Sequence, residues 1–190
     1  YKVTGVQTCA LPICQTAQDS VSLGGAFAEV GVHTGETTLF IHKPLASLRV
    51  TPAYFCIDTF TGFTSKDIAV ERQRGKKEDF SGLFRLSSRR LLEASLEHHG
   101  LSDTVTIFEA DAAEFSYNTL PSLAWALVDL DVLRPMRAAL EGCWERLLPG
   151  GVLIADDCQD ATHAWDGARE AYEEFCEAHD LPIDLRAEKL

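Results

Sequence analysis

The sequence lacks the features that place a protein in a membrane or on a nucleic-acid backbone. No apolar run approaches the roughly 20 residues that a membrane-spanning helix needs. Basic residues are few, because 17 Lys and Arg stand against 29 Asp and Glu, and the formal net charge is −12. Binding to a phosphate backbone normally requires a basic face. We therefore expect neither a nucleic-acid partner nor a membrane partner.

Cysteine patterns are also missing. The six cysteines form no C-x-x-C pair and have no regular spacing, so the sequence indicates neither a zinc site nor a disulfide framework. This usage fits a reducing compartment, and we expect a cytoplasmic protein. With 190 residues, 46% of them hydrophobic, the chain suits one α/β domain with its own core.

Residues 3–13 resemble the conceptual translation of a common sequencing-adapter oligonucleotide. Such a run is left out of fold reasoning, as a fusion scar would be. We expect residues 1–14 to be non-native and residues 15–190 to form one incomplete domain, truncated at both ends. The alternative is a genuine apolar N-terminal segment or a poor signal peptide, whose apolar stretch is broken by Pro12.

Apolar runs alternate with amphipathic stretches along the remaining chain. Strands are predicted at residues 25–32, 52–58, 105–108, 123–128 and 152–155, and helices at about 36–48, 87–99, 134–148 and 164–179. The charged stretch 64–79 is predicted to be an exposed loop, which either covers the crevice or has no role. Alternating strands and helices with short links indicate a three-layer α/β sandwich around a parallel or mostly parallel sheet.

Two acidic clusters close strands that are predicted to be buried. Asp129-Leu130-Asp131 follows one apolar run, and Asp156-Asp157 follows the next. The carboxyl ends of parallel strands meet at one edge of the sheet, where ligands bind. Carboxylates packed this closely raise one another's pKa unless a cation lies among them. Such oxygen ligands suit a hard divalent ion. The alternative to a metal site is that these acids cap helices and lie in solvated turns.

The first predicted strand leads into a turn with two glycines, Glu29-Val30-Gly31-Val32-His33-Thr34-Gly35. It lacks the middle glycine of the dinucleotide fingerprint, which disfavours a nicotinamide or flavin enzyme. Backbone at Gly31 and Gly35 can approach a ligand closely, and Glu29 can accept a hydrogen bond from an ammonium. The alternative is a tight strand-to-helix turn.

Two further acids follow predicted strands. Asp58 lies where an acid holds ribose hydroxyls in nucleotide-binding α/β folds, and its alternative is a strand-terminal turn residue. Asp111 either addresses an adenine edge or caps the helix that follows. Three residues lie near the predicted crevice without an assigned role: His33, His163 and Trp165.

In this order and spacing the motifs resemble the macrocin O-methyltransferase type of class I S-adenosylmethionine-dependent methyltransferase. The shared residues extend over roughly Gly25 to Phe175 and are Glu29-Val30-Gly31-Val32 with Gly35, Asp58-Thr59-Phe60-Thr61-Gly62-Phe63, Asp129-Leu130-Asp131, Leu148-Pro149-Gly150-Gly151, Asp156-Asp157, and Gly167-Ala168 with Ala171 and Phe175. The resemblance implies a Rossmann-like fold, S-adenosylmethionine as cofactor, and magnesium-dependent methyl transfer to a hydroxyl, often of a sugar on a glycosylated natural product.

On this chain the resemblance makes Asp129, Asp156 and Asp157 the Mg²⁺ ligands and Asp131 the general base. A metal-bound hydroxyl has a lowered pKa, so a neighbouring carboxylate can take its proton. The expected partner is a small-molecule hydroxyl acceptor such as a glycoside. The chain departs from the family at Cys158, where an aromatic residue is usual, and at Ala110, where a glycine is commoner.

Two other functions compete with this interpretation. One is metal-independent methyl transfer to a small phenol or amine, and the other is a catalytically inactive cofactor-binding fragment. The identity of the acceptor is open, because it depends on segments outside the motifs. A homo-oligomer is compatible with the sequence.

Overall fold

The computed structural model describes residues 2–6, 10–77, 82–85, 87–158 and 166–186. Within these residues, seven parallel strands form one sheet in the order β4-β3-β2-β5-β6-β1-β7. The strands are β1 (Lys2–Val6), β2 (Ala26–Val30), β3 (Tyr54–Asp58), β4 (Val105–Glu109), β5 (Leu123–Val128), β6 (Leu147–Ala155) and β7 (Leu185–Arg186). The predicted parallel sheet is confirmed.

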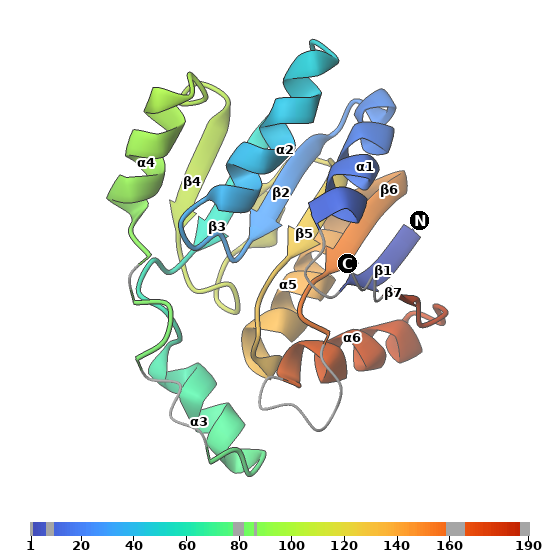
Figure 1. Cartoon of the computed structure of the whole chain (residues 1–190). Coiled ribbons are helices and arrows are strands. Elements are labelled where there is room, and N and C mark those ends of the chain that lie inside the picture. Colours follow the sequence, from blue (N-terminus) through green and yellow to red (C-terminus); the bar gives the residue numbers. More distant parts are fainter. Residues whose placement is uncertain (1, 7–9, 78–81, 86, 159–165, 187–190) are drawn as a thin grey trace.

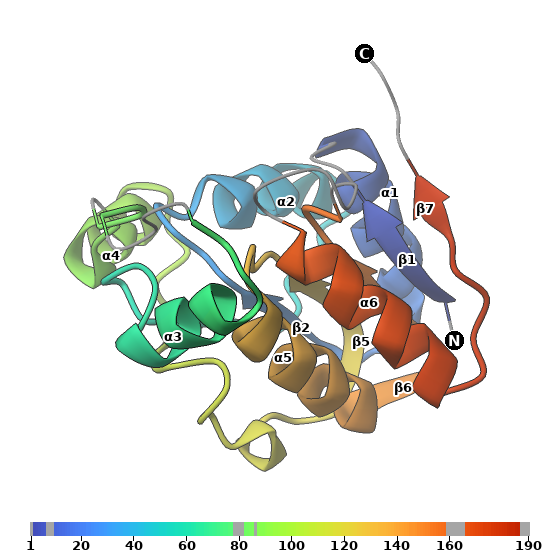
Figure 2. The same ribbon diagram turned by 90° about the horizontal axis from the view of Figure 1, so that it is seen from below.

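Helices cover both faces of the sheet. They are α1 (Ala10–Ser20), α2 (Glu36–Ser47), α3 (Ser65–Gln73), α4 (Arg89–His98), α5 (Leu133–Arg146) and α6 (Gly167–Ala178), with short 3-10 turns η1 (Val21–Leu23) and η2 (Tyr117–Thr119). Figure 2 shows α1, α2 and α4 on one face, and α5 and α6 on the other. The fold is the predicted three-layer, Rossmann-like sandwich.

The central strands are buried on both sides, which explains their continuous apolar runs. All six residues of β5 are buried. Because successive side chains point to opposite faces, Phe27 joins the core under α1, α2 and α4, whereas Ala28 and Val30 join the core under α5 and α6. Packing on both faces therefore fixes the register of the strands, and with it the positions of the residues that follow them.

Residues 65–73 form helix α3, so the prediction of an exposed loop at 64–79 is wrong there. Thr64 and Asp67 build a capping box, in which the Asp67 amide donates to Thr64 Oγ1 at 3.2 Å and the Thr64 amide donates to Asp67 Oδ2 at 2.9 Å. The helix buries Asp67 and Glu71 rather than apolar side chains. It was missed because ion pairs, not an apolar stripe, dock it. α3 lies beyond the carboxyl ends of the strands (Figure 1).

The N-terminal segment takes part in the described fold. β1 pairs with β6 and β7, and α1 places Ile13 and Ala17 in the core. The indole Nε1 of Trp125 donates to Thr16 Oγ1 at 3.1 Å. The non-native origin of residues 1–14 stays a prediction. Residues 7–9, like His163 and Trp165, lie outside the described residues. Among the helices that the structure describes, none is long and apolar enough to cross a membrane.

Candidate functional site

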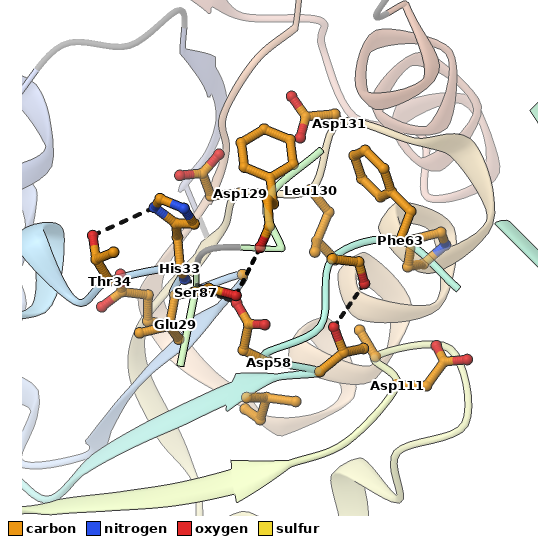
Figure 3. Close-up of a pocket in the computed structure, with 18 of the residues that line it drawn as sticks. Glu29, His33, Thr34, Asp58, Phe63, Ser87, Asp111, Asp129, Leu130 and Asp131 are labelled. Carbon is orange, nitrogen blue, oxygen red and sulfur yellow. Dashed lines mark hydrogen bonds between the residues drawn. The ribbon is translucent and has the colours of Figure 1, made fainter. Parts of the chain in front are cut away.

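A cavity of about 270 Å³ lies at the carboxyl edge of the sheet. Its wall is built by the segments that follow β2, β3, β4 and β5, together with Asp157 after β6 (Figure 3). The structure brings most of the predicted site residues to this wall, namely Glu29, Gly31, Asp58, Asp111, Asp129, Asp131 and Asp157. Gly35 and Asp156 are the two predicted site residues that are not part of it.

Glu29 is a buried carboxyl at the base of the cavity, with 1% of its surface exposed. The hydroxyls of Thr38 and Tyr54 both donate to its Oε2, each at 2.7 Å. Burial raises the pKa of Glu29 to about 7, although these two hydrogen bonds act in the opposite direction. In the described part of the chain no hydrogen bond reaches Oε1, which leaves that oxygen for a ligand cation.

The raised pKa of Glu29 predicts a pH-dependent cost in stability. Because the folded state favours the neutral carboxyl, stability falls as pH rises from the unfolded value of 4.5 through about 7. The shift corresponds to about 3 kcal/mol. Glu29→Gln retains an oxygen acceptor for Thr38 and Tyr54 but does not titrate. Its free energy of unfolding, measured in urea, should therefore gain about 2.5 kcal/mol on wild type between pH 5 and pH 8, since part of the shift falls below pH 5. An equal difference at both pH values would contradict this account of Glu29.

Asp58 holds the glycine turn in place. Its Oδ2 accepts hydrogen bonds from the amides of Val32 and His33 at 2.7 and 2.9 Å, and its Oδ1 accepts from the Phe60 amide at 2.6 Å. These bonds fix the loop after β2 against the end of β3. A carboxylate has about four lone-pair sites, so Asp58 retains acceptor capacity toward the cavity that it lines.

The two glycines of the turn have different neighbours. Gly31 has φ +86°, and a Cβ at this position would come within 2.0 Å of the Asp129 carbonyl oxygen. Gly35 has φ +83°, and a Cβ there would meet the Leu92 side chain of α4 at 2.2 Å. Gly31 therefore allows close approach between two cavity-forming loops, whereas Gly35 allows α2 to begin beside α4.

Asp111 is held by the protein itself. Its Oδ1 accepts from the Ala113 amide at 2.9 Å, and its Oδ2 accepts from the Arg134 guanidinium at 3.0 Å. The predicted alternative of a helix cap is wrong, because a turn at residues 112–114 follows Asp111 in place of a helix. Arg134 also contacts Asp67 Oδ1 of α3 at 2.6 Å. Arg134 thus joins α3 to the loop after β4, and both acids line the cavity.

The acids after β5 and β6 form one electrostatic cluster. Burial first, and then the charges of Asp156 and Asp157, raise the pKa of Asp129 well above its usual range. Burial and the Asp157 carboxylate raise the pKa of Asp131 to about 8. Asp156 is 4% exposed and accepts a hydrogen bond from the Asp157 amide at 2.9 Å. A cation among these groups would lower their pKa values.

The oxygen-only donors of this cluster suit Mg²⁺ by their chemistry. Within the residues that the structure describes, however, no three His, Cys, Asp or Glu side chains are arranged to hold a metal ion together. The described carboxylates therefore lie near one another, but as placed here they do not form a metal-binding site. Asp157 has φ +53°, an uncommon conformation for a residue other than glycine.

Several residues of the site carried no signal in the sequence. Thr38 and Tyr54 reach Glu29 only through the packing of α2 and β3 against β2. At the cavity mouth, Phe84 meets His33 and Phe63 edge to face, with ring centroids 5.6 and 5.4 Å apart. Asp67 also lines the cavity, and the spacing of Thr64 and Asp67 was the available signal for its position.

Together, the sheet and its edge cavity define an α/β protein with a cavity at the carboxyl ends of its parallel strands, the place where ligands bind in such folds. The model of the methyltransferase domain family matches residues 28–158, which include the strands that build the site. The chain belongs to this family. The sequence has no match among curated proteins.

Solved methyltransferase structures share the fold at low sequence identity. The calicheamicin methyltransferase CalS11 is 24% identical with a TM-score of 0.73, over 95% of this chain and 75% of that one. The O-methyltransferase NovP is 18% identical with a TM-score of 0.70, over 92% and 75%. PaMTH1 of Podospora anserina, with S-adenosylhomocysteine bound, is 11% identical with a TM-score of 0.55, over 91% and 70%. The predicted fold class is confirmed.

Proposed function

We propose that the protein is a Mg²⁺-assisted O-methyltransferase of the macrocin type, which transfers methyl from S-adenosylmethionine to a hydroxyl of a sugar or glycosylated natural product. The observation that carries this proposal is that one cavity holds two groups of acidic residues at different places on its wall. Glu29 and Asp58 lie at the glycine turn, and Asp129, Asp131 and Asp157 lie at the ends of β5 and β6. Two relatives of similar fold are named as calicheamicin methyltransferase and as O-methyltransferase NovP.

The residues at the glycine turn would bind the cofactor, whose sulfonium supplies an electrophilic methyl group. Glu29 Oε1 would accept a hydrogen bond from the amino-acid ammonium, which also favours the ionised form of this carboxyl. Asp58 would accept from the ribose hydroxyls while it continues to hold the Val32 and His33 amides. Asp111, fixed by Arg134, would border the adenine.

The acidic cluster would handle the acceptor. Asp131 would take the proton of the attacking hydroxyl, and this requires its ionised form. Asp129, Asp156 and Asp157 would hold Mg²⁺ only after their side chains rearrange from the positions in this structure, where no three such side chains of the described residues form a metal site. The bound ion would lower the pKa of an acceptor hydroxyl. Fixed placement of the hydroxyl beside the methyl group would supply much of the remaining acceleration.

The charge of the cavity favours an acceptor without phosphate groups. Eight of the lining residues are Asp or Glu, and in the described part of the chain no Lys or Arg lines the cavity. Arg134 pairs with two of these acids, Asp67 and Asp111, and the ionised acids among the others would repel a diphosphate that is not bound to a cation. CalS11 is described as a TDP-rhamnose 3'-O-methyltransferase. We therefore propose that the acceptor of this chain is a glycoside, that is, a sugar that has already been transferred from its nucleotide carrier.

The role of the metal predicts a selective loss on mutation. Asp157→Asn should reduce Mg²⁺-stimulated methyl transfer by about 100-fold, whereas the affinity for S-adenosylhomocysteine should change less than about 3-fold, because the glycine turn is untouched. Transfer of labelled methyl to a panel of glycosides, with Mg²⁺ or with a chelator, measures the first quantity, and calorimetry measures the second. Activity that persists in excess chelator would instead support the metal-independent alternative.

A further inference from the structure

Arg74 is a partly buried cation at the end of α3, in the segment where the sequence predicted a loop. Only 13% of its side chain is exposed. Its guanidinium binds Glu71 of α3, Asp166 directly before α6, and Glu170 within α6, and the contact to Asp166 is 2.9 Å long. One side chain therefore joins two helices that are more than 90 residues apart in the sequence.

Glu71 extends this connection to the acids after β5. The Leu133 amide, at the beginning of α5, donates to Glu71 Oε1 at 2.9 Å. Leu133 is two residues beyond Asp131, so a carboxylate that fixes this amide also fixes the end of the Asp129–Asp131 loop. Glu71 is 2% exposed. A buried carboxylate in this position depends on its cationic partner, which is Arg74.

The beginnings of α5 and α6 also touch directly. A Cβ on Gly167 would come within 2.5 Å of the Leu133 nitrogen and 3.0 Å of the Val132 Cα. β6, the strand that precedes α6, ends at Ala155 and is followed by Asp156 and Asp157. Lys76 supports the same junction, because its ammonium lies 2.7 Å from Asp166 Oδ2. The helix that follows each acidic pair is thus tied to α3.

We propose that Arg74 is a positioning residue for the acidic cluster. Through Glu71 it holds the end of the loop that carries Asp129 and Asp131, and through Asp166 and Glu170 it holds the beginning of α6 against the same loop, so that it fixes the position of these two acids. The role of those acids rests on the proposed function. The positioning itself is a structural property and can be measured without activity.

The test compares Arg74→Gln with Arg137→Gln, a matched change. Arg137 also pairs with α6, through Glu174 and, at 3.9 Å, through Glu170, but 48% of its side chain is exposed and it contacts neither Glu71 nor Asp166 in the ion pairs of the described residues. Amide hydrogen exchange should quicken by about 10-fold at residues 130–133 and 166–168 in Arg74→Gln only, while residues 26–30 of β2 stay protected. The affinity for Mg²⁺, measured by calorimetry, should fall by about 10-fold, with unchanged binding of S-adenosylhomocysteine.

Each result has a distinct meaning. Unchanged exchange at residues 130–133 in folded Arg74→Gln would overturn the positioning role, whatever the activity. Faster exchange there, together with wild-type protein that binds no Mg²⁺, would confirm the positioning role and contradict only the metal in the proposed function. If Arg74→Gln does not fold, Asp166→Asn separates one arm: exchange should quicken at residues 166–168 and not at 130–133. Arg74→Lys should give smaller changes than Arg74→Gln, because Lys keeps the positive charge. Some change should remain, because Lys cannot bridge the three carboxylates as a planar fork.

Discussion

Asp131→Asn is expected to lower kcat for methyl transfer by about 1000-fold, within the range for loss of a general base. Asn has almost the same shape as Asp, but it cannot accept the proton of the acceptor hydroxyl. Asp131 lines the cavity beside Asp129 and Asp157, and burial with the charge of Asp157 raises its pKa to about 8. Steady-state kinetics with saturating cofactor and a glycoside acceptor measures the loss.

Two controls give this result its meaning. Asp103→Asn changes an exposed acid far from the cavity and should retain wild-type kcat. The affinity of Asp131→Asn for S-adenosylhomocysteine should stay within about 3-fold of wild type, because Asp131 is not part of the glycine turn. A variant that retains wild-type kcat would remove Asp131 from the role of base.

Gly31→Ala should cause the largest loss of stability among substitutions at the site. The added Cβ would lie 2.0 Å from the Asp129 carbonyl oxygen, and backbone atoms cannot move aside as a flexible side chain can. The neighbouring backbone is fixed by hydrogen bonds from the Gly31 amide to Ile57 O and from the Asp129 amide to Val30 O, at 2.9 and 2.8 Å. We expect a loss of about 4 kcal/mol in the free energy of unfolding, from positive-φ strain and overpacking together.

Gly24→Ala separates the two contributions. Gly24 also has positive φ, at +68°, but no atom lies within 4 Å of the position that its Cβ would take. This variant should lose only about 1 kcal/mol, the cost of the left-handed conformation. Urea unfolding of both variants gives the comparison. Equal losses would mean that close approach to Asp129 contributes nothing.

Local sequence pattern was sufficient to predict the strands β2 to β6 and the helices α2, α4, α5 and α6. β5 is an unbroken apolar run because both of its faces are buried, and the acids at its end follow directly. α3 could not be predicted from hydrophobic periodicity, since its buried residues are Asp67 and Glu71. Only the capping box at Thr64 and Asp67 marked its beginning. No strand was predicted within residues 1–14, which include the adapter-like run 3–13, yet the structure places Lys2–Val6 in the sheet as β1.

The site residues also fall into those that local sequence could predict and those that depend on tertiary packing. The end of a parallel strand is readable from sequence, so Asp58, Asp111, Asp129 and Asp157 could be placed at one edge. Their partners could not, because these come from tertiary packing: Tyr54 reaches Glu29 from the adjacent strand, and Arg134 reaches Asp111 from the beginning of α5. The same limit applies to Arg74, whose partners belong to α3 and to the region of α6.

Calorimetric titration of S-adenosylhomocysteine into the folded chain tests the central claim most directly, with Mg²⁺ present and then with a chelator. The account predicts one binding site per chain under both conditions. It also predicts that Asp58→Ala loses binding, because this change removes the acceptor for ribose and releases the amides of Val32 and His33. A folded wild-type protein that gives no binding heat and no rise in melting temperature with the ligand would contradict the assignment of this cavity to the methyl donor.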